Sequence, residues 1–232
     1  MASTIQLTTA DGQSFDAYFC EAGTTDAPGI VMIQEIFGIN QSMRTLAQQW
    51  SARGYHVLVP DLFWRQERNV ELEPRVEAEF SQGVALMQAV DQEVAVQDLD
   101  LARQWLASHA GHDRIGSMGY CFGGRMVVKM AEASPIRCAV SFYGVGLEEF
   151  VPNLPANTAP TLLHIAELDG YVPPAVRAKL LDEATQRPDW ESHVYMGCDH
   201  AFARPEGANW VEEAATLAND RSQEFLQQHL SA

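Results

Sequence analysis

A cysteine between glycines stands where the chain is best suited to nucleophilic chemistry. Residues 119–124 read Gly-Tyr-Cys-Phe-Gly-Gly, between an apolar stretch that predicts a strand and a stretch that predicts a helix. This is the G-x-nucleophile-x-G elbow with Cys121 in place of serine. The start of the following helix supplies partial positive charge and a free backbone N–H, which favour a thiolate and an oxyanion. The alternative is a glycine-rich turn around a packed cysteine.

Such a nucleophile needs a base, and the base needs an acid that orients it. In this arrangement the chain order is nucleophile, acid, histidine. Asp169 follows the predicted strand Thr161–Ala166, with Glu167 as a nearby rival, and a surface Asp-Gly turn is the alternative for Asp169. His200 stands after the last predicted strand and before the last predicted helix, unlike the other six histidines. We therefore predict a triad of Cys121, Asp169 and His200.

The loop after an earlier strand predicts the second half of an oxyanion hole. Residues 34–38 read Gln-Glu-Ile-Phe-Gly at the end of a predicted buried strand. In the elbow arrangement this loop donates one backbone N–H and the residue after the nucleophile donates the other. Ile36 and Phe122 are the candidate pair. Glu35 would then lie near Cys121; the alternative is a carboxylate that faces solvent.

The elements that must position these residues alternate between strands and helices, which predicts βαβ units and a mostly parallel sheet. Asp11-Gly12 is a hairpin signal between the first two strands. The predicted strands are 4–8, 15–20, 29–34, 55–60, 114–119, 136–143, 161–166 and 192–196. The predicted helices are 41–53, a long stretch from 73 to about 109 that contains one or two helices, 122–133, 174–185 and 206–229.

Composition limits the class of protein. The chain has 232 residues, 47% of them hydrophobic, and 15 Lys+Arg against 31 Asp+Glu give a net charge of −16. The length fits one α/β domain over residues 1–232. The negative charge argues against nucleic-acid and anionic-membrane partners. The sequence contains no run of about 18 apolar residues, so no membrane span is predicted. Its first residues show no secretory signal, so a cytoplasmic protein is expected.

The four cysteines, at positions 20, 121, 138 and 198, show no metal-ligand spacing, so no metal site is predicted. They are expected to be free thiols in a reducing compartment. Cys20 and Cys138 lie in apolar strands and are expected to be packed, whereas Cys198 stands two residues before His200.

At these residues the chain resembles the dienelactone hydrolase (carboxymethylenebutenolidase) family of α/β-hydrolases. The matching stretches are QEIFGIN (34–40), GYHVLVPDLF (54–63), GYCFGG (119–124), FYGVGLE (142–148) and DHAFAR (199–204). The resemblance implies an α/β-hydrolase fold with a mostly parallel sheet of about eight strands flanked by helices. It also implies a monomer without cofactor or metal.

The resemblance further implies hydrolysis of a dienelactone-type enol lactone to a maleylacetate-type acid through a thioester. The family's Glu holds the resting cysteine in a poorly nucleophilic state until substrate displaces that contact. Carried over residue by residue, the triad falls on Cys121, Asp169 and His200, the oxyanion amides on Ile36 and Phe122, and the Glu on Glu35.

Substrate recognition departs from the family at several positions. Arg204 matches a carboxylate-binding arginine of the family, and a guanidinium fork suits that task. Phe80 stands near the position of a second family arginine, for which Arg75 is an alternative cation. Ala201 and Phe142 replace a frequent Ser and a frequent Tyr. These departures do not change the predicted hydrolase class. They extend the candidate substrates to substituted or larger lactones or esters.

Four aromatic residues are candidates for the substrate site, each with core packing as the alternative: Phe37, Trp64, Tyr143 and Phe202. Three functions remain open at this point. The first is a lactone hydrolase, and the second is a general carboxylesterase or thioesterase of the same fold. The third is a ligand-binding or redox-sensing protein with a reactive cysteine and no turnover.

Overall fold

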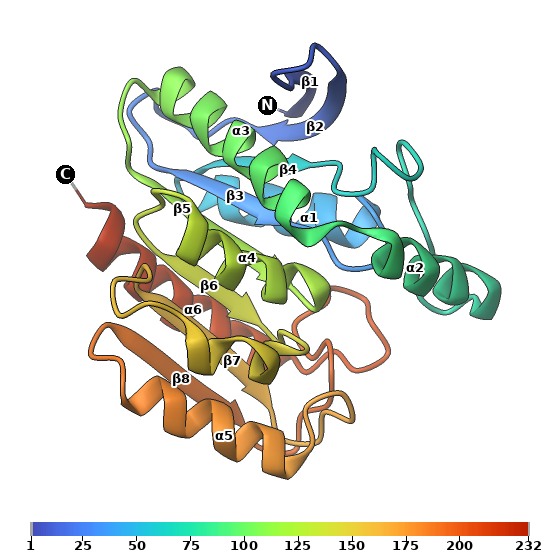
Figure 1. Ribbon diagram of the computed structural model, residues 1–232, viewed down its shortest axis with the longest axis vertical. Coiled ribbons are helices and arrows are strands. Elements are labelled where there is room, and N and C mark those ends of the chain that lie inside the picture. Colours follow the sequence, from blue (N-terminus) through green and yellow to red (C-terminus); the bar gives the residue numbers. More distant parts are fainter. Residues whose placement is uncertain (1, 232) are drawn as a thin grey trace.

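One sheet of eight strands runs through the computed structural model, which describes residues 2–231 (Figure 1). The strand order is β1-β2-β4-β3-β5-β6-β7-β8. β1 (Ala2–Thr8) pairs antiparallel with β2 (Ser14–Cys20), and β2 pairs antiparallel with β4 (His56–Pro60). The other pairings are parallel. The mostly parallel eight-stranded sheet that the sequence predicts is confirmed.

The central strands read as apolar runs because helices cover both faces of the sheet. These strands are β3 (Gly29–Ile33), β5 (Ile115–Tyr120), β6 (Ala139–Phe142) and β7 (Thr161–Ala166), all buried along their length, with β8 (Trp190–Tyr195) at the edge. Two short 3₁₀ turns, Leu147–Glu149 and Val151–Asn153, follow β6.

Two helical layers enclose the sheet. Helices α1 (Gln41–Ala52) and α6 (Glu212–Leu230) cover one face of the sheet and share a buried cluster with Ile30 and Met32 of β3. Helices α3 (Gln92–Ala110), α4 (Phe122–Ala133) and α5 (Pro174–Thr185) cover the other face, and their buried side chains share a cluster with Val31 and Ile33 of β3. Figure 1 shows the same layers, with α2 (Glu77–Ala89) standing apart beyond the carboxyl ends of the strands.

The long helical stretch predicted from residue 73 divides into α2 and α3. The break is at residues 90 and 91, where Asp91 caps α3 by accepting hydrogen bonds from the Glu93 and Val94 amides at 3.1 and 3.2 Å. An N-cap side chain satisfies amides that have no partner inside the helix. The second of the two alternatives, two helices, is therefore the one observed.

The predicted helix 206–229 is wrong at its start, because α6 begins only at Glu212. Glu206 has a φ of +59°, which a right-handed helix does not accommodate. Asn209 donates a side-chain hydrogen bond to the carbonyl of His200 at 2.8 Å. Residues 206–211 are therefore a loop that supports His200. The strand predicted at 136–143 is also shorter, at 139–142.

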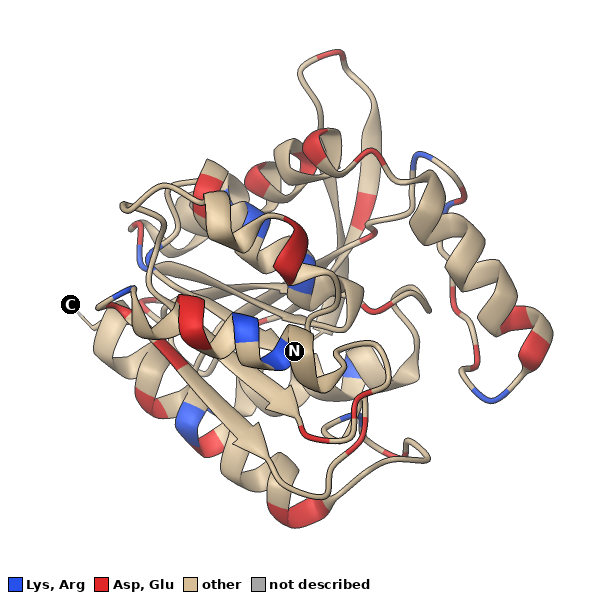
Figure 2. Ribbon diagram, turned by 60° about the horizontal axis from the view of Figure 1, so that its bottom comes forward, with Lys and Arg blue, Asp and Glu red and all other residues tan. Residues whose placement is uncertain are grey.

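The acidic residues are spread over all parts of the fold, and the Lys and Arg residues are scattered among them (Figure 2). None of the helices within residues 2–231 is long and apolar enough to cross a membrane.

Candidate active site

Cys121 lies on a strained turn at the carboxyl end of β5. Its backbone has φ +56° and ψ −117°, directly before α4 begins at Phe122. A non-glycine residue with such angles is held there only when its surroundings enforce it. The Cys121 amide donates to the carbonyl of Phe142 at 3.0 Å, and the side chain is 9% exposed. The turn therefore places the sulfur at the sheet edge, where a cavity reaches it.

The elbow requires glycine at position 123, and Gly123→Ala is expected to destabilise the protein. A Cβ atom there would lie 2.2 Å from the carbonyl oxygen of Ile33 and 2.6 Å from that of Gln34. Both oxygens belong to backbone that cannot move without disturbing β3. We expect the free energy of unfolding to fall by about 3 kcal/mol in urea denaturation, the upper range for overpacking. Gly23→Ala is the control, since its Cβ would meet nothing within 4 Å; equal losses in both would contradict the prediction.

His200 and Asp169 form a buried hydrogen-bonded pair. The His200 Nδ1 lies 2.8 Å from Asp169 Oδ2, and the Tyr171 amide donates to Asp169 Oδ1 at 2.9 Å. Asp169 is 3% exposed. The carboxylate therefore fixes a proton on Nδ1 and leaves Nε2 for the nucleophile. Nε2 is buried and has no hydrogen-bond partner within residues 2–231, and His200 shares its cavity with Cys121.

Two of the predicted aromatic residues support His200 from behind. The Tyr143 ring meets the His200 ring edge to face at a centroid distance of 5.1 Å, and Phe202 packs on Tyr143 at 5.6 Å. Both side chains are almost fully buried and neither lines the cavity. Among the described residues, neither ring therefore belongs to the lining of the cavity. Of the other two predicted aromatic residues, Phe37 lines the cavity and Trp64 does not.

The charge state of His200 is set by two opposing influences. Burial lowers the pKa of His200, but the charge of a Cys121 thiolate and the hydrogen bond that His200 donates to Asp169 raise it to about 10, from an ordinary value of 6.5. A raised pKa means that the imidazolium stabilises the fold. That contribution is fully present below pH 6.5 and is lost as the pH rises through about 10.

We expect His200 to titrate near pH 10 in ¹⁵N-histidine NMR spectra of the wild type, with the signal assigned by its loss in His200→Gln. In Cys121→Ala the pKa of His200 should be lower, because the negative sulfur is gone. The same pKa for His200 in both proteins would show that the sulfur carries no charge near the ring.

The backbone amides of Ile36 and Phe122 are free at the same edge of the sheet. Among residues 2–231, neither amide donates a hydrogen bond, although both residues are buried. The loop that carries Ile36 is held by the Ile39 amide on the Val70 carbonyl at 3.1 Å, and by the Leu72 amide on the Phe37 carbonyl at 2.9 Å. Free, fixed donors are the requirement for binding an oxyanion.

Glu35 forms a bidentate ion pair with Arg204. The Arg204 Nε lies 2.6 Å from Glu35 Oε2, and its Nη2 lies 3.0 Å from Oε1. Glu35 is 2% exposed, so its solvent-facing alternative does not apply. Burial lowers the pKa of Arg204, but the Glu35 carboxylate raises it by more than burial lowers it, so the guanidinium stays charged. In this structure the carboxylate that was expected near Cys121 is bound by Arg204.

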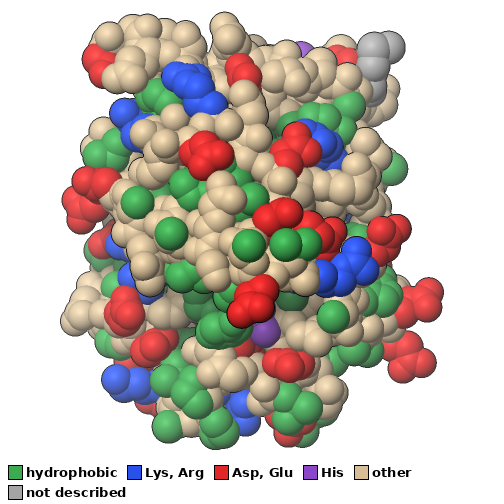
Figure 3. Space-filling model, turned by 90° about the vertical axis from the view of Figure 1, so that its right-hand side faces the viewer, with side chains coloured by type: hydrophobic (Ala, Val, Ile, Leu, Met, Phe, Trp, Pro, Cys, Tyr) green, Lys and Arg blue, Asp and Glu red, His purple; other side chains and the backbone are tan. Residues whose placement is uncertain are grey.

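These groups meet in a cavity of about 650 Å³ that is lined by Cys121, His200, Ile36, Phe37 and Arg204, among others. Figure 3 looks onto this edge of the sheet: hydrophobic side chains surround a recess in which a histidine is visible, and acidic side chains lie close to it.

Comparisons with known proteins identify the family of the chain. The sequence matches the model of the Dienelactone hydrolase family over residues 15–230. The chain belongs to this family. It is 40% identical to a candidate carboxymethylenebutenolidase of Azospirillum brasilense, over 97% of this chain and 98% of that one. It is 34% identical to Carboxymethylenebutenolidase 1 of Cupriavidus pinatubonensis, over 97% of each.

The solved structure of a candidate dienelactone hydrolase from Klebsiella pneumoniae superposes with a TM-score of 0.83. It is 25% identical in sequence, over 98% of this chain and 99% of that one. The α/β-hydrolase fold, the family and a hydrolase of the carboxymethylenebutenolidase type, all predicted from the sequence, are thereby confirmed.

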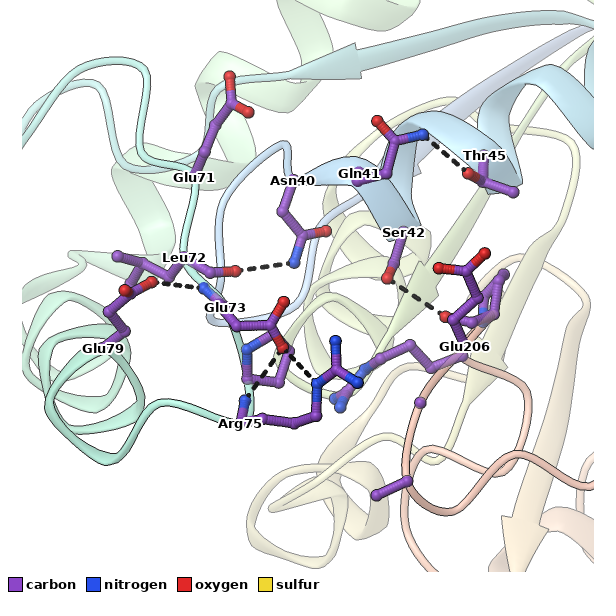
Figure 4. A pocket seen from close by; sticks show the side chains of 15 residues that line it. Asn40, Gln41, Ser42, Thr45, Glu71, Leu72, Glu73, Arg75, Glu79 and Glu206 are labelled. Atoms are coloured by element: carbon purple, nitrogen blue, oxygen red, sulfur yellow. Dashed lines mark hydrogen bonds and ion pairs between the residues drawn. The ribbon is translucent and has the colours of Figure 1, made fainter.

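This dienelactone hydrolase family member has a second, polar cavity beside the first. It measures about 320 Å³ and shares Pro74 and Arg204 with the catalytic cavity. Arg75 Nε donates a hydrogen bond to Glu73 Oε1 at 2.9 Å within this cavity, and Figure 4 shows the two side chains. Its charged lining residues are four glutamates against two arginines: Glu71, Glu73, Glu79 and Glu206, with Arg75 and Arg204. An anion that approaches from this side therefore meets a net negative lining.

No group of three or more His, Cys, Asp or Glu side chains in residues 2–231 is placed to hold a metal ion. Cys20, Cys138 and Cys198 are buried free thiols.

The sequence interpretation missed the apolar residues that α2 brings to the cavity, Val84 and Met87. With Phe80 they follow the spacing of one helix face, and that spacing was the available signal.

Proposed function

We propose that the chain hydrolyses an enol lactone of the dienelactone type, with Cys121 as nucleophile, His200 as general base and acid, and Asp169 as the residue that orients His200. The observation that supports this most is the position of His200. Its Nδ1 is fixed by a buried carboxylate while its unpartnered Nε2 shares a cavity with Cys121. This is the relation that a nucleophile, a base and an orienting acid require.

The first half of the reaction opens the ring. His200 takes the proton of Cys121, and the thiolate attacks the lactone carbonyl carbon. The carbonyl oxygen becomes an oxyanion that accepts hydrogen bonds from the Ile36 and Phe122 amides, each worth about 3 kcal/mol when strong. When the tetrahedral adduct collapses, the ring C–O bond breaks and the enolate leaves. The imidazolium of His200 returns a proton to it, and a thioester remains on Cys121.

The second half regenerates the enzyme. His200, now neutral, takes a proton from a water molecule that attacks the thioester carbonyl. The same two amides hold the second oxyanion, the C–S bond breaks, the imidazolium of His200 returns its proton to the Cys121 sulfur, and the carboxylic acid leaves. Cys121 is then again a thiol, and His200 is again neutral. The names of the curated relatives, which are carboxymethylenebutenolidases, support a lactone of this class as the substrate.

Hydrolysis of cis- and trans-dienelactone by wild type and Cys121→Ala tests the proposal. We expect turnover by the wild type and a loss of at least about 10⁴-fold in kcat in the variant, as for other nucleophile deletions. Cys198→Ala is the matched control, because Cys198 is also a buried thiol and does not line the cavity. Turnover that survives in Cys121→Ala would reject Cys121 as nucleophile.

A further inference from the structure

Helix α2 builds one wall of the catalytic cavity from apolar side chains. Phe80, Val84 and Met87 line the cavity, and their spacing of four and three residues places them on one face of the helix. The charged residues of α2, Glu77 and Glu79, both lie in its first turn. In Figure 2 the remainder of this helix carries no charge. A group that lies against this wall therefore meets no charged side chain of α2.

Gly83 belongs to the same face and brings α2 against the oxyanion loop. It is buried, whereas the other residues of the helix are exposed or partly exposed. A Cβ atom at this position would lie 2.5 Å from the carbonyl oxygen of Ile36 and 3.3 Å from its carbonyl carbon. Any side chain would push the helix away, so glycine keeps the apolar wall next to the reacting centre.

Two large apolar side chains outside α2 also line the cavity and are exposed. Leu168 is 60% exposed and Tyr171 is 58% exposed, and both line the cavity together with Phe80, which is 37% exposed. Large apolar side chains left in water around a recess mark a surface that a ligand covers. Here the recess contains Cys121, so the ligand is the substrate of that cysteine.

Charge around the cavity disfavours an anionic group on the substrate. The Arg204 guanidinium, which lines the cavity, is already neutralised by Glu35 through two hydrogen bonds. The adjoining polar cavity carries four glutamates against two arginines. The whole chain carries a net charge of −16. A carboxylate on the substrate is therefore repelled on approach and must compete with the Glu35 carboxylate for Arg204.

We propose that the substituent of the substrate that lies against α2 is uncharged and apolar. The preferred substrate is then an enol lactone or enol ester with an alkyl or aryl group in place of a free carboxylate. This inference rests on the proposed function and narrows its substrate class.

Three lactones that share one reacting ring test the inference: the carboxymethylene butenolide, its ethyl ester and the benzylidene butenolide. We expect kcat/KM of the wild type for each neutral lactone to exceed that for the carboxylate by about tenfold or more, mainly through KM. Added salt should raise kcat/KM for the carboxylate by screening the repulsion and leave the neutral lactones unaffected. A wild type that prefers the carboxylate would overturn the inference.

Two charge variants of the α2 segment assign the preference to the apolar wall. Phe80→Arg places a cation in the wall, whereas Val76→Arg adds the same charge at a residue that is 41% exposed and does not line the cavity. We expect Phe80→Arg to raise kcat/KM for the carboxylate and lower it for the benzylidene lactone, each by about tenfold. Val76→Arg should leave the ratio between substrates unchanged. Equal effects of the two variants would overturn the inference.

Binding to the inactive variant separates this inference from the proposed function. If the wild type hydrolyses none of the three lactones, the proposed function fails. Calorimetric titration of Cys121→Ala with the same lactones then decides the inference alone. Tighter binding of the benzylidene lactone supports it, and tighter binding of the carboxylate overturns it.

Discussion

Asp169→Asn is expected to lower kcat for lactone hydrolysis by about 10⁴-fold while the protein stays folded. The Asn oxygen can still accept the hydrogen bond that the Tyr171 amide gives to Asp169 Oδ1 at 2.9 Å. Its NH₂ group then faces the His200 Nδ1, which must become an acceptor. The ring proton moves to Nε2, the atom that has to take the proton of Cys121, so the base is blocked.

Glu167→Gln is the matched control, because Glu167 is the rival acid two residues earlier. Its carboxylate accepts a hydrogen bond from the Gly197 amide at 2.7 Å, and a glutamine oxygen can keep that bond. We expect kcat to change little. Steady-state rates of both variants, with circular dichroism spectra to verify folding, decide between the two acids. A large loss in Glu167→Gln with activity retained in Asp169→Asn would transfer the role to Glu167.

Arg204→Met is expected to lower the free energy of unfolding by about 3–5 kcal/mol, the typical effect of breaking a buried ion pair on one side. The change leaves the Glu35 carboxylate, which is 2% exposed, without its bidentate partner. An unpaired charge at this burial costs much more than the lost contact. Urea denaturation at pH 7 measures the difference from the wild type.

The double variant Glu35→Gln/Arg204→Met supplies the control for this prediction. It removes both charges, so most of the lost free energy of unfolding should return, and the coupling between the two positions should be large. Arg53→Met is an exposed comparison, because its pair with Asp220 lies at the surface at 3.3 Å. There we expect a change of about 1 kcal/mol or less. A similar loss at both arginines would contradict the prediction.

The order and type of most elements follow from local sequence. The strands β3, β4, β5 and β7 are short, mostly apolar stretches that are buried along their length, and this pattern is typical of a parallel sheet covered on both faces. The start of α6 was predicted too early, although Gly207 and Asn209 are weak helix formers. The loop there depends on Asn209 reaching the His200 carbonyl, which is a tertiary contact.

The candidate site divides in the same way. Motif spacing brings Asp169 beside His200, and the structure places these side chains in contact. The partner of Glu35 could not be read from the sequence, since Arg204 is 169 residues away. Tyr143 and Phe202 were expected in the cavity, and their depth behind His200 depends on how β6 and the 199–211 loop pack together. Burial depth is a property of the packed fold, which residue type alone does not determine.

Helix α2 has one buried residue, and this has an evolutionary consequence. Gly83 is the part of this helix that enters the interior, while Phe80, Val84 and Met87 remain partly or fully accessible. Val84 and Met87 are only partly buried where they pack against the core, so replacing them costs less free energy of unfolding than replacing a fully buried core residue. The wall can therefore accumulate substitutions without passing through unstable intermediates. Within this scaffold, the range of accepted lactones can drift while the reacting groups and the fold stay as they are.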